Sequence, residues 1–156
     1  MFTNILVALD GSELAEQALP VARDLAGSSN ATIHLIQVVS RQPELEAARG
    51  GGDFGIQAIE LERDLAHQLV EARISRAKTY LEGIAVQLQS EGFQAETTIG
   101  EGAAAENIVN YSREHGIDLV VMSSHGHGGV KRLLLGSVTD GVIRSCEAPV
   151  LVLPCS

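Results

Sequence analysis

Short apolar runs alternate with longer segments of helical periodicity along nearly the whole chain, and this alternation limits the possible folds most strongly. The first run, Ile5-Leu6-Val7-Ala8-Leu9, contains no polar residue, which is typical of a strand buried on both faces. In the segment after it, apolar residues recur three and four positions apart, which predicts a crossover helix. Repeated along the chain, the pattern predicts an α/β fold: one doubly wound, five-stranded parallel sheet with helices on both faces.

The same patterns assign the individual elements. Strands are predicted over residues 4–9, 32–39, 94–99, 118–122 and 150–153, and helices over 13–26, 58–90, 103–115 and 137–146. Pro20 lacks an N–H group, so we expect a kink in the first helix. The strand at 94–99 is polar, which favours a position at the edge of the sheet. Residues 41–57 include Pro43 and three consecutive glycines and predict a flexible connection, for which a plain linker is favoured over a ligand lid.

Length and charge limit the classes of protein to which the chain can belong. Its 156 residues suit a single domain spanning residues 1–156. The formal net charge of -9 opposes binding to nucleic acid, whose phosphates attract clustered Lys and Arg. Two cysteines are compatible with a reducing compartment, and the sequence has neither a secretory signal pattern nor an apolar run long enough to span a membrane. We therefore expect a cytoplasmic protein that binds neither nucleic acid nor membrane.

The stretch from Val120 to Val138 has the composition of a phosphate-binding loop. An apolar strand ends at Ser123-Ser124-His125-Gly126, nine residues follow, and Gly136-Ser137 then opens a helix. Glycine lets a ligand approach the backbone closely, and the first N–H groups of a helix are ready donors to an anion. Ser137 is expected to cap that helix, with Asp140 completing a capping box. The alternative is that the glycines only form turns and bind no ligand. The additional Gly136-Ser137 pair at the start of the helix favours phosphate binding.

These residues resemble the universal stress protein family, whose nucleotide-binding members carry Gly-x-x-Gly, nine residues, and then Gly-Ser or Gly-Thr. The first glycine of that pattern is Ser123 here, which adds a hydroxyl and restricts the backbone. The resemblance extends from Asn4 to Leu153 and implies an adenine nucleotide alpha hydrolase-like fold with strand order 3-2-1-4-5. Ligands of such sheets bind where the strand order reverses, which here is between the first and fourth strands.

The resemblance implies a regulatory stress-response protein that binds ATP, or ADP or AMP, with magnesium in this crevice. Asp10, directly after the first strand, would meet sugar hydroxyls or magnesium-bound phosphate. The alternative is that Asp10 only caps the first helix, because Asp10-x-x-Glu13 mimics a capping box. The residues expected to contact the nucleotide are Ala8, Leu9, Asp10, Val38, Met122, Ser123, His125, Gly126, Gly136, Ser137 and Val138.

Binding is better supported by these residues than catalysis. His125 and His127 supply at most two metal ligands, and no carboxylate or thiolate cluster completes a tetrahedral set. The chain has no Gly-Lys-Ser/Thr phosphate loop and no second acidic residue that pairs obviously with Asp10. A nucleotide-free interaction module stays open as an alternative. So does a slow ATPase or autophosphorylating protein, with phosphate received by Ser123, Ser124, Ser137 or Thr139.

The last predicted strand indicates how the chain associates. Val150-Leu151-Val152-Leu153 is short, apolar and expected at a sheet edge. Exposed edges of this composition pair readily with another strand. We therefore expect a homodimer that forms through residues 150–153, as the resemblance also implies.

Overall fold

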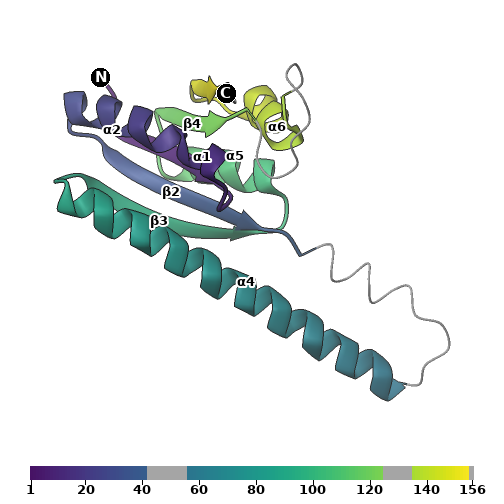
Figure 1. The fold of residues 1–156 in the computed structure, drawn as a ribbon. Helices are drawn as coiled ribbons and strands as arrows, with labels where there is room; N and C mark the ends of the chain where they lie inside the picture. Colours follow the sequence, from purple (N-terminus) through teal and green to yellow (C-terminus); the bar gives the residue numbers. More distant parts are fainter. Residues whose placement is uncertain (42–55, 125–134, 155–156) are drawn as a thin grey trace.

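Strands and helices alternate along the chain (Figure 1). The structure is a computed structural model that describes residues 1–41, 56–124 and 135–154, with the backbone alone for residues 56–59. Its strands are β1 (Asn4–Leu9), β2 (Thr32–Val39), β3 (Gln94–Glu101), β4 (Leu119–Ser123) and β5 (Val150–Leu153). Its helices are α1 (Glu13–Glu16), α2 (Ala18–Ser29), α4 (Ile56–Ser90), α5 (Ala104–Glu114) and α6 (Ser137–Ser145). Each predicted strand is present, as is each predicted helix after the first, with small shifts at the ends.

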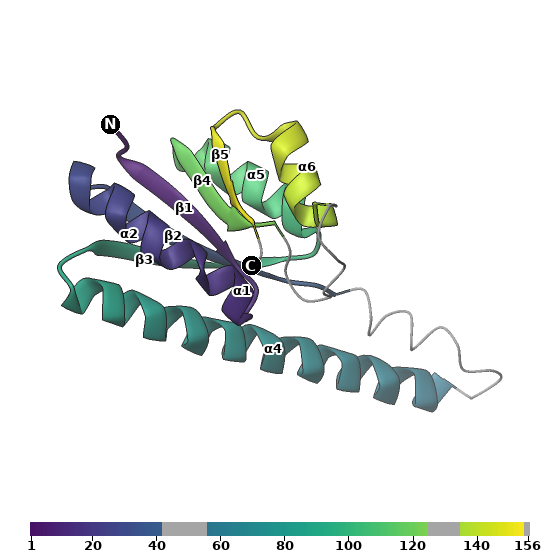
Figure 2. The same ribbon diagram turned by 45° about the horizontal axis from the view of Figure 1, so that its top comes forward.

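The strands form one parallel sheet with the order β3-β2-β1-β4-β5 (Figure 2). β1 lies between β2 and β4, with Ile5 paired to Ile33 on one side and to Leu119 on the other. This arrangement confirms the predicted strand order and the predicted edge positions of β3 and β5. The chain runs outward from β1 to β3 and then returns to β4 on the opposite side, so the strand order reverses between β1 and β4.

Both faces of the sheet are covered by helices (Figures 1 and 2). On one face, Ile5 and Val7 pack with residues of α1, α2 and α4, among them Leu81. On the other face, Leu6 packs with residues of α5 and α6, among them Val142. Successive strand residues point to opposite faces, so a central strand of a two-sided core must be apolar throughout. Each large side chain buried in this way contributes about 1.5–3 kcal/mol.

The first helix differs from its prediction. The sequence predicts one helix over 13–26 that is kinked by Pro20, whereas the structure has two helices, α1 and α2, separated at Gln17. The N–H of Gln17 bonds to the carbonyl of Leu14 at 3.3 Å, a tighter turn than an α-helix makes. In a continuous helix, the carbonyl of Glu16 would accept from the N–H of residue 20, which Pro20 lacks. The helix breaks directly after Glu16. Pro20 itself lies in the first turn of α2, where proline is tolerated.

Helix α4 is the longest element and projects well beyond the sheet (Figure 1). The connection predicted over residues 41–57 lies mostly outside the described residues, and α4 already begins at Ile56. Within the described ranges, no helix combines the length and apolar character needed to cross a membrane.

Candidate functional site

Asp10 follows β1 directly, at the edge of the sheet where the strand order reverses. In the register, Leu9 of β1 pairs with Gln37 of β2, and Val7 pairs with Val121 of β4. Carried on along the strands, this register places Asp10 level with Val38 and Ser124. Three strands therefore end together around Asp10, as the resemblance implies.

The Asp10 carboxylate is held by the turn that follows β1. Its Oδ1 accepts hydrogen bonds from the N–H of Ser12 at 2.9 Å and from the hydroxyl of Ser12 at 2.5 Å. Gly11 between them has a φ of +83°, which residues with a Cβ rarely adopt. Ser12 caps α1, because its Oγ accepts from the N–H of Ala15 at 3.2 Å. The alternative, a capping box headed by Asp10, is thus wrong: Asp10 orients Ser12, the residue that caps the helix.

A cavity of about 120 Å³ lies next to Asp10. Seven of the predicted contact residues line it: Ala8, Leu9, Asp10, Val38, Met122, Ser123 and Val138. The other lining residues, Ala15, Ile36, Ala104, Ile108 and Thr139, were not among the predicted nucleotide contacts. The walls are mostly apolar, with polar groups from Asp10, Ser123 and Thr139. Such a surface suits a flat, weakly polar group that is anchored at few points.

Helix α6 is tied to the ends of β4 and β5 beside this cavity. The hydroxyl of Thr139 donates to the carbonyl of Ser123 at 3.1 Å, and both residues are buried. The N–H of Ser124 donates to the carbonyl of Leu153 at 2.8 Å. The carbonyl of Ser124 accepts from the N–H of Gly136, also at 2.8 Å. The start of α6 is therefore fixed against the strand ends.

The beginning of α6 corrects two predictions. Gly136 is the N-cap residue, with φ of -58° and ψ of 154°, and Ser137 is already helical. No side chain caps the helix, and Asp140 pairs with Arg144 at 2.8 Å instead of completing a capping box. The N–H of Gly136 donates to the carbonyl of Ser124, so it is not available to an anion. The donors that α6 offers are the next three N–H groups, at 137–139, which have no partner within the helix.

The remaining predicted residues divide into two groups. His125 and Gly126 lie outside the described residues. Gly136, which is half-buried, and Ser137, which is exposed, directly precede Val138 of the cavity wall. The described part of the predicted site is therefore brought together at one place.

A larger cavity of about 440 Å³ lies beside α4, and Asp10 and Val38 border it as well. Arg73 and Arg76 of α4 line this cavity and bring positive charge to the same edge of the sheet. Tyr80, also in its wall, donates its hydroxyl to Glu16 at 2.7 Å. Burial, together with this hydrogen bond, raises the pKa of Tyr80. The helical pattern of α4 shows which of its faces is apolar, but not which of its turns reaches Asp10, so these residues were missed.

Comparison with known proteins identifies the family. A family model described as "Universal stress protein family" matches residues 1–154. The chain belongs to this family. The universal stress protein MJ0577 of Methanocaldococcus jannaschii is 32% identical over 158 residues, which cover 98% of this chain and 95% of that protein. Universal stress protein YxiE of Bacillus subtilis is 31% identical over 156 residues, covering 98% of this chain and 99% of the relative.

Solved structures of universal stress proteins share the fold. The structure of MJ0577 has a TM-score of 0.79 at 31% identity and covers 100% of this chain and 98% of that chain. A universal stress protein in complex with cAMP has a TM-score of 0.60 at 23% identity, covering 99% and 98% of the two chains. The protein from Archaeoglobus fulgidus in complex with dAMP has a TM-score of 0.61 at 19% identity, covering 97% of each chain. The last two likenesses show the fold alone.

Proposed function

We propose that this universal stress protein binds an adenine nucleotide, with ATP as the first choice, and acts as a cytoplasmic regulatory protein in a stress response. One observation carries the proposal: an apolar cavity at the strand-order reversal has Asp10 and the first turn of α6 beside it. An apolar recess, a hydroxyl-binding carboxylate and a helix N-terminus match the base, the sugar and the phosphates of one ligand.

The dimensions indicate how such a ligand would lie. A volume of about 120 Å³ is smaller than the ~300–1,000 Å³ of typical ligand pockets, so the cavity would hold the base. The Asp10 carboxylate would accept hydrogen bonds from the sugar hydroxyls. The phosphates would then reach the N–H groups at 137–139 and the exposed hydroxyl of Ser137. Magnesium would arrive with the phosphates, since it keeps several waters and needs only one or two carboxylates, here Asp10.

The charges around α6 are compatible with an anion at its N-terminus. Asp140 lies in the first turn and would oppose a phosphate, but Arg144 pairs with it at 2.8 Å. The N-terminal end of the helix dipole favours a negative ligand by about 0.3–1 kcal/mol near the surface. The charges of the described residues at this end of α6 therefore allow a phosphate to be held by main-chain donors.

Binding without turnover is the better supported activity. Of the four hydroxyls considered as phosphate acceptors, those of Ser123, Ser124 and Thr139 are buried, and Thr139 donates to the carbonyl of Ser123. Ser137 alone among the four is exposed. Autophosphorylation would therefore modify Ser137. Mass spectrometry after incubation with ATP and magnesium, with Ser137→Ala as the control, distinguishes this activity from binding.

Relatives support the class of ligand. Two structures with this fold hold cAMP and dAMP, both adenine nucleotides. MJ0577 and YxiE align with nearly the full length of this chain. A nucleotide-binding role therefore agrees with the fold and with the local chemistry.

The proposal is tested by titrating the purified protein with ATP, ADP and AMP in a calorimeter. The chain has no Trp and two Tyr, so a copurifying nucleotide would also dominate the ultraviolet spectrum. Gly136→Val is expected to weaken binding at least tenfold, because its side chain would enter the phosphate position while valine tolerates the same backbone angles. Gly83→Val, on an exposed part of α4 where a Cβ meets nothing within 4 Å, is the control. No heat with any of the three nucleotides would leave the nucleotide-free module as the better description.

We also propose a homodimer that forms through β5. The carbonyls of Pro149 and Leu153 accept from β4, so the backbone groups of Val150 and Val152 face outward from the sheet edge. A second β5 strand can pair with these groups. Val152→Pro removes an outward N–H without touching the bonds to β4. Sedimentation should show a dimer for the wild type and dissociation for the variant.

A further inference from the structure

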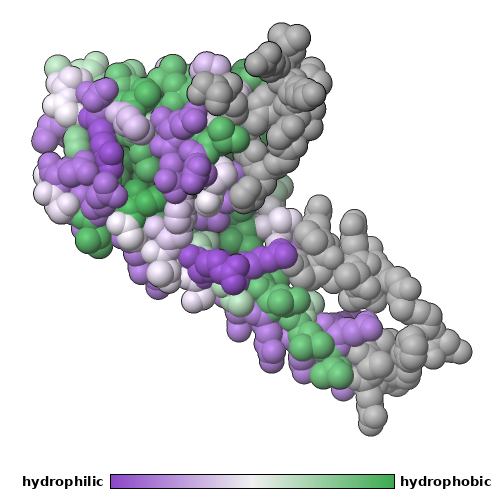
Figure 3. Space-filling model, viewed as in Figure 1, coloured by the Kyte–Doolittle hydropathy of each residue, from purple (hydrophilic) through white to green (hydrophobic). Residues whose placement is uncertain are grey.

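Three leucines form an exposed line on the part of α4 that projects beyond the sheet. Leu61, Leu65 and Leu69 are 62%, 51% and 56% exposed, and their spacing of four places them along one side of the helix. Figure 3 shows hydrophobic surface along this part of α4, bordered by hydrophilic residues. Farther along the same helix, Leu81 and Leu88 are completely buried. The projecting part therefore carries apolar side chains that the described residues leave in water.

This leucine line does not continue the face of α4 that packs on the sheet. An α-helix turns by about 100° per residue, so Leu81 lies about 160° around the axis from Leu65. The leucine line thus faces nearly away from the side that carries Leu81. The described residues of the sheet leave the three leucines more than half exposed.

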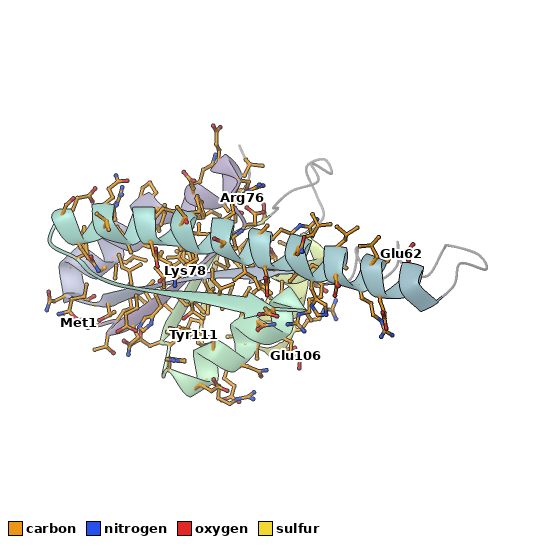
Figure 4. All side chains as sticks on the ribbon, turned by 90° about the horizontal axis from the view of Figure 1, so that it is seen from below. Met1, Glu62, Arg76, Lys78, Glu106 and Tyr111 are labelled. Atoms are coloured by element: carbon orange, nitrogen blue, oxygen red, sulfur yellow. The ribbon has the colours of Figure 1, made fainter. Side chains whose placement is uncertain are left out.

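The charges on this part of α4 are divided into an acidic and a basic half. Residues 60–64 contain three acidic residues and one arginine: Glu60, Glu62, Asp64 and Arg63. Residues 71–78 contain three basic residues and one glutamate: Arg73, Arg76, Lys78 and Glu71. Figure 4 shows Glu62 on the projecting part, and Arg76 and Lys78 closer to the sheet. Such a helix is complementary to a copy of itself that runs in the opposite direction.

We propose that the leucine line of α4 docks against the same line of a second copy of this chain, with the two helices antiparallel. Leu65 of one copy lies opposite Leu69 of the other, and the acidic half of each helix lies beside the basic half of its partner. The contact is two-fold symmetric, as most homodimer contacts are. A parallel pair would instead place like charges side by side. The projection of α4 lets a second helix lie alongside it without meeting the sheet (Figures 1 and 2).

The size of the leucine line sets the strength of this contact. Stable complexes bury about 1,200–2,000 Å² in total, which is more than three partly exposed leucines on each side provide. The contact is therefore weak by itself. It acts at high protein concentration.

The test is sedimentation velocity on the full chain over a range of concentrations, in the Val152→Pro background. This background removes the proposed β5 pairing, so the remaining association reports on α4 alone. Leu65→Glu is expected to weaken it at least tenfold. Val86→Glu is the matched control, because Val86 is 64% exposed on the same helix but lies outside the overlap. A protein that stays monomeric in this background, or equal effects of the two variants, would overturn the proposal.

Charge reversal distinguishes a second copy from any other apolar partner. Glu62→Arg with Asp64→Arg makes both halves of the helix basic, and Arg73→Glu with Arg76→Glu makes both halves acidic. Each pair of substitutions is expected to weaken association severalfold. All four together exchange the two halves and should restore it. Failure of the fourfold variant to recover would rule out the antiparallel arrangement.

Discussion

The hydroxyl of Thr139 donates a hydrogen bond to the main-chain carbonyl of Ser123 at 3.1 Å and so joins the first turn of α6 to the last residue of β4. Both residues are buried and both line the cavity next to Asp10. The sequence pattern that begins at Ser123 and ends at Gly136-Ser137 joins the same two elements. Within it, the N–H of Gly136 also donates to the carbonyl of Ser124. The N-terminal end of α6, where we propose that phosphate binds, is therefore positioned by the strand.

Thr139→Val is expected to destabilise the protein. Valine has nearly the same shape, but it leaves the buried carbonyl of Ser123 without this donor, which costs about 1–3 kcal/mol. Thr139→Ser keeps the hydroxyl and should lose less stability. Urea denaturation of the three proteins measures the difference. If Thr139→Val unfolds at the same urea concentration as the wild type, the hydrogen bond contributes nothing.

Asp10→Asn and Ser12→Ala separate ligand binding from helix capping. Asparagine at position 10 can still accept from Ser12, but it lacks the charge, so ATP affinity should fall about tenfold, as expected for one lost charged hydrogen bond. Loss of the Ser12 cap should cost about 1 kcal/mol of unfolding free energy. Calorimetry and urea denaturation of both variants give the two readouts. The reverse pattern, with affinity lost only in Ser12→Ala, would make Asp10 purely structural.

The fold was predictable because its central strands are buried on both faces. The uninterrupted apolar run from Ile5 to Leu9 is too short for a typical helix, and a turn and a helical pattern follow it. A strand buried on both faces is therefore its expected structure. Strand order was less accessible, because no local pattern states which strands pair, and it came from the family resemblance. Once the order was given, Asp10 and Ser123 followed as neighbours of one cavity.

The details of the site were harder to predict because they depend on competition between local hydrogen bonds. Ser137 has the right residue type for a cap, yet Gly136 takes the cap position because its N–H bonds to Ser124. Asp140 likewise finds Arg144 one turn away. Arg73 reaches the edge of the sheet at Asp10 only because of where the long helix α4 crosses it. The spacing of four allows the Asp140–Arg144 pair but does not decide between it and a capping box, and the other two choices leave no sign in residue spacing.

Gly141→Ala and Gly83→Ala are expected to change stability in opposite directions. Alanine favours a helix over glycine by about 1 kcal/mol. At Gly141 of α6, however, a Cβ would stand 2.9 Å from the Cβ of Ala105 of α5, and such overpacking costs about 1–3 kcal/mol. At Gly83 of α4 nothing lies within 4 Å of the new Cβ. Thermal unfolding should show a lower Tm for Gly141→Ala and a higher Tm for Gly83→Ala, and equal shifts would mean that α5 moves away without cost.

A buried histidine links three elements on the α5 side of the sheet. His34 Nε2 lies 3.2 Å from Asn4 Oδ1, which can only accept, so the ring proton is assigned to Nε2. The other ring nitrogen, Nδ1, then accepts from the Tyr111 hydroxyl at 3.0 Å. The ring of Tyr111 stacks on His115 at 3.8 Å. The carboxylate of Glu96 lies 3.5 Å from Nδ1. Burial lowers the pKa of His34, and His115 adds to this effect, although Glu96 opposes it.

This cluster predicts that the protein loses stability as the pH falls below neutrality. The pKa of His34 is lower in the folded chain than its ordinary value of 6.5, so the unfolded chain binds the proton first. The contribution of neutral His34 is complete well above pH 6.5 and decreases as the pH falls from there toward the pKa in the folded state. Urea denaturation at a series of pH values between about 8 and 5.5 measures this slope. His34→Gln, which retains a donor and an acceptor but cannot titrate in this range, should flatten it; an unchanged slope would assign the pH dependence to other groups.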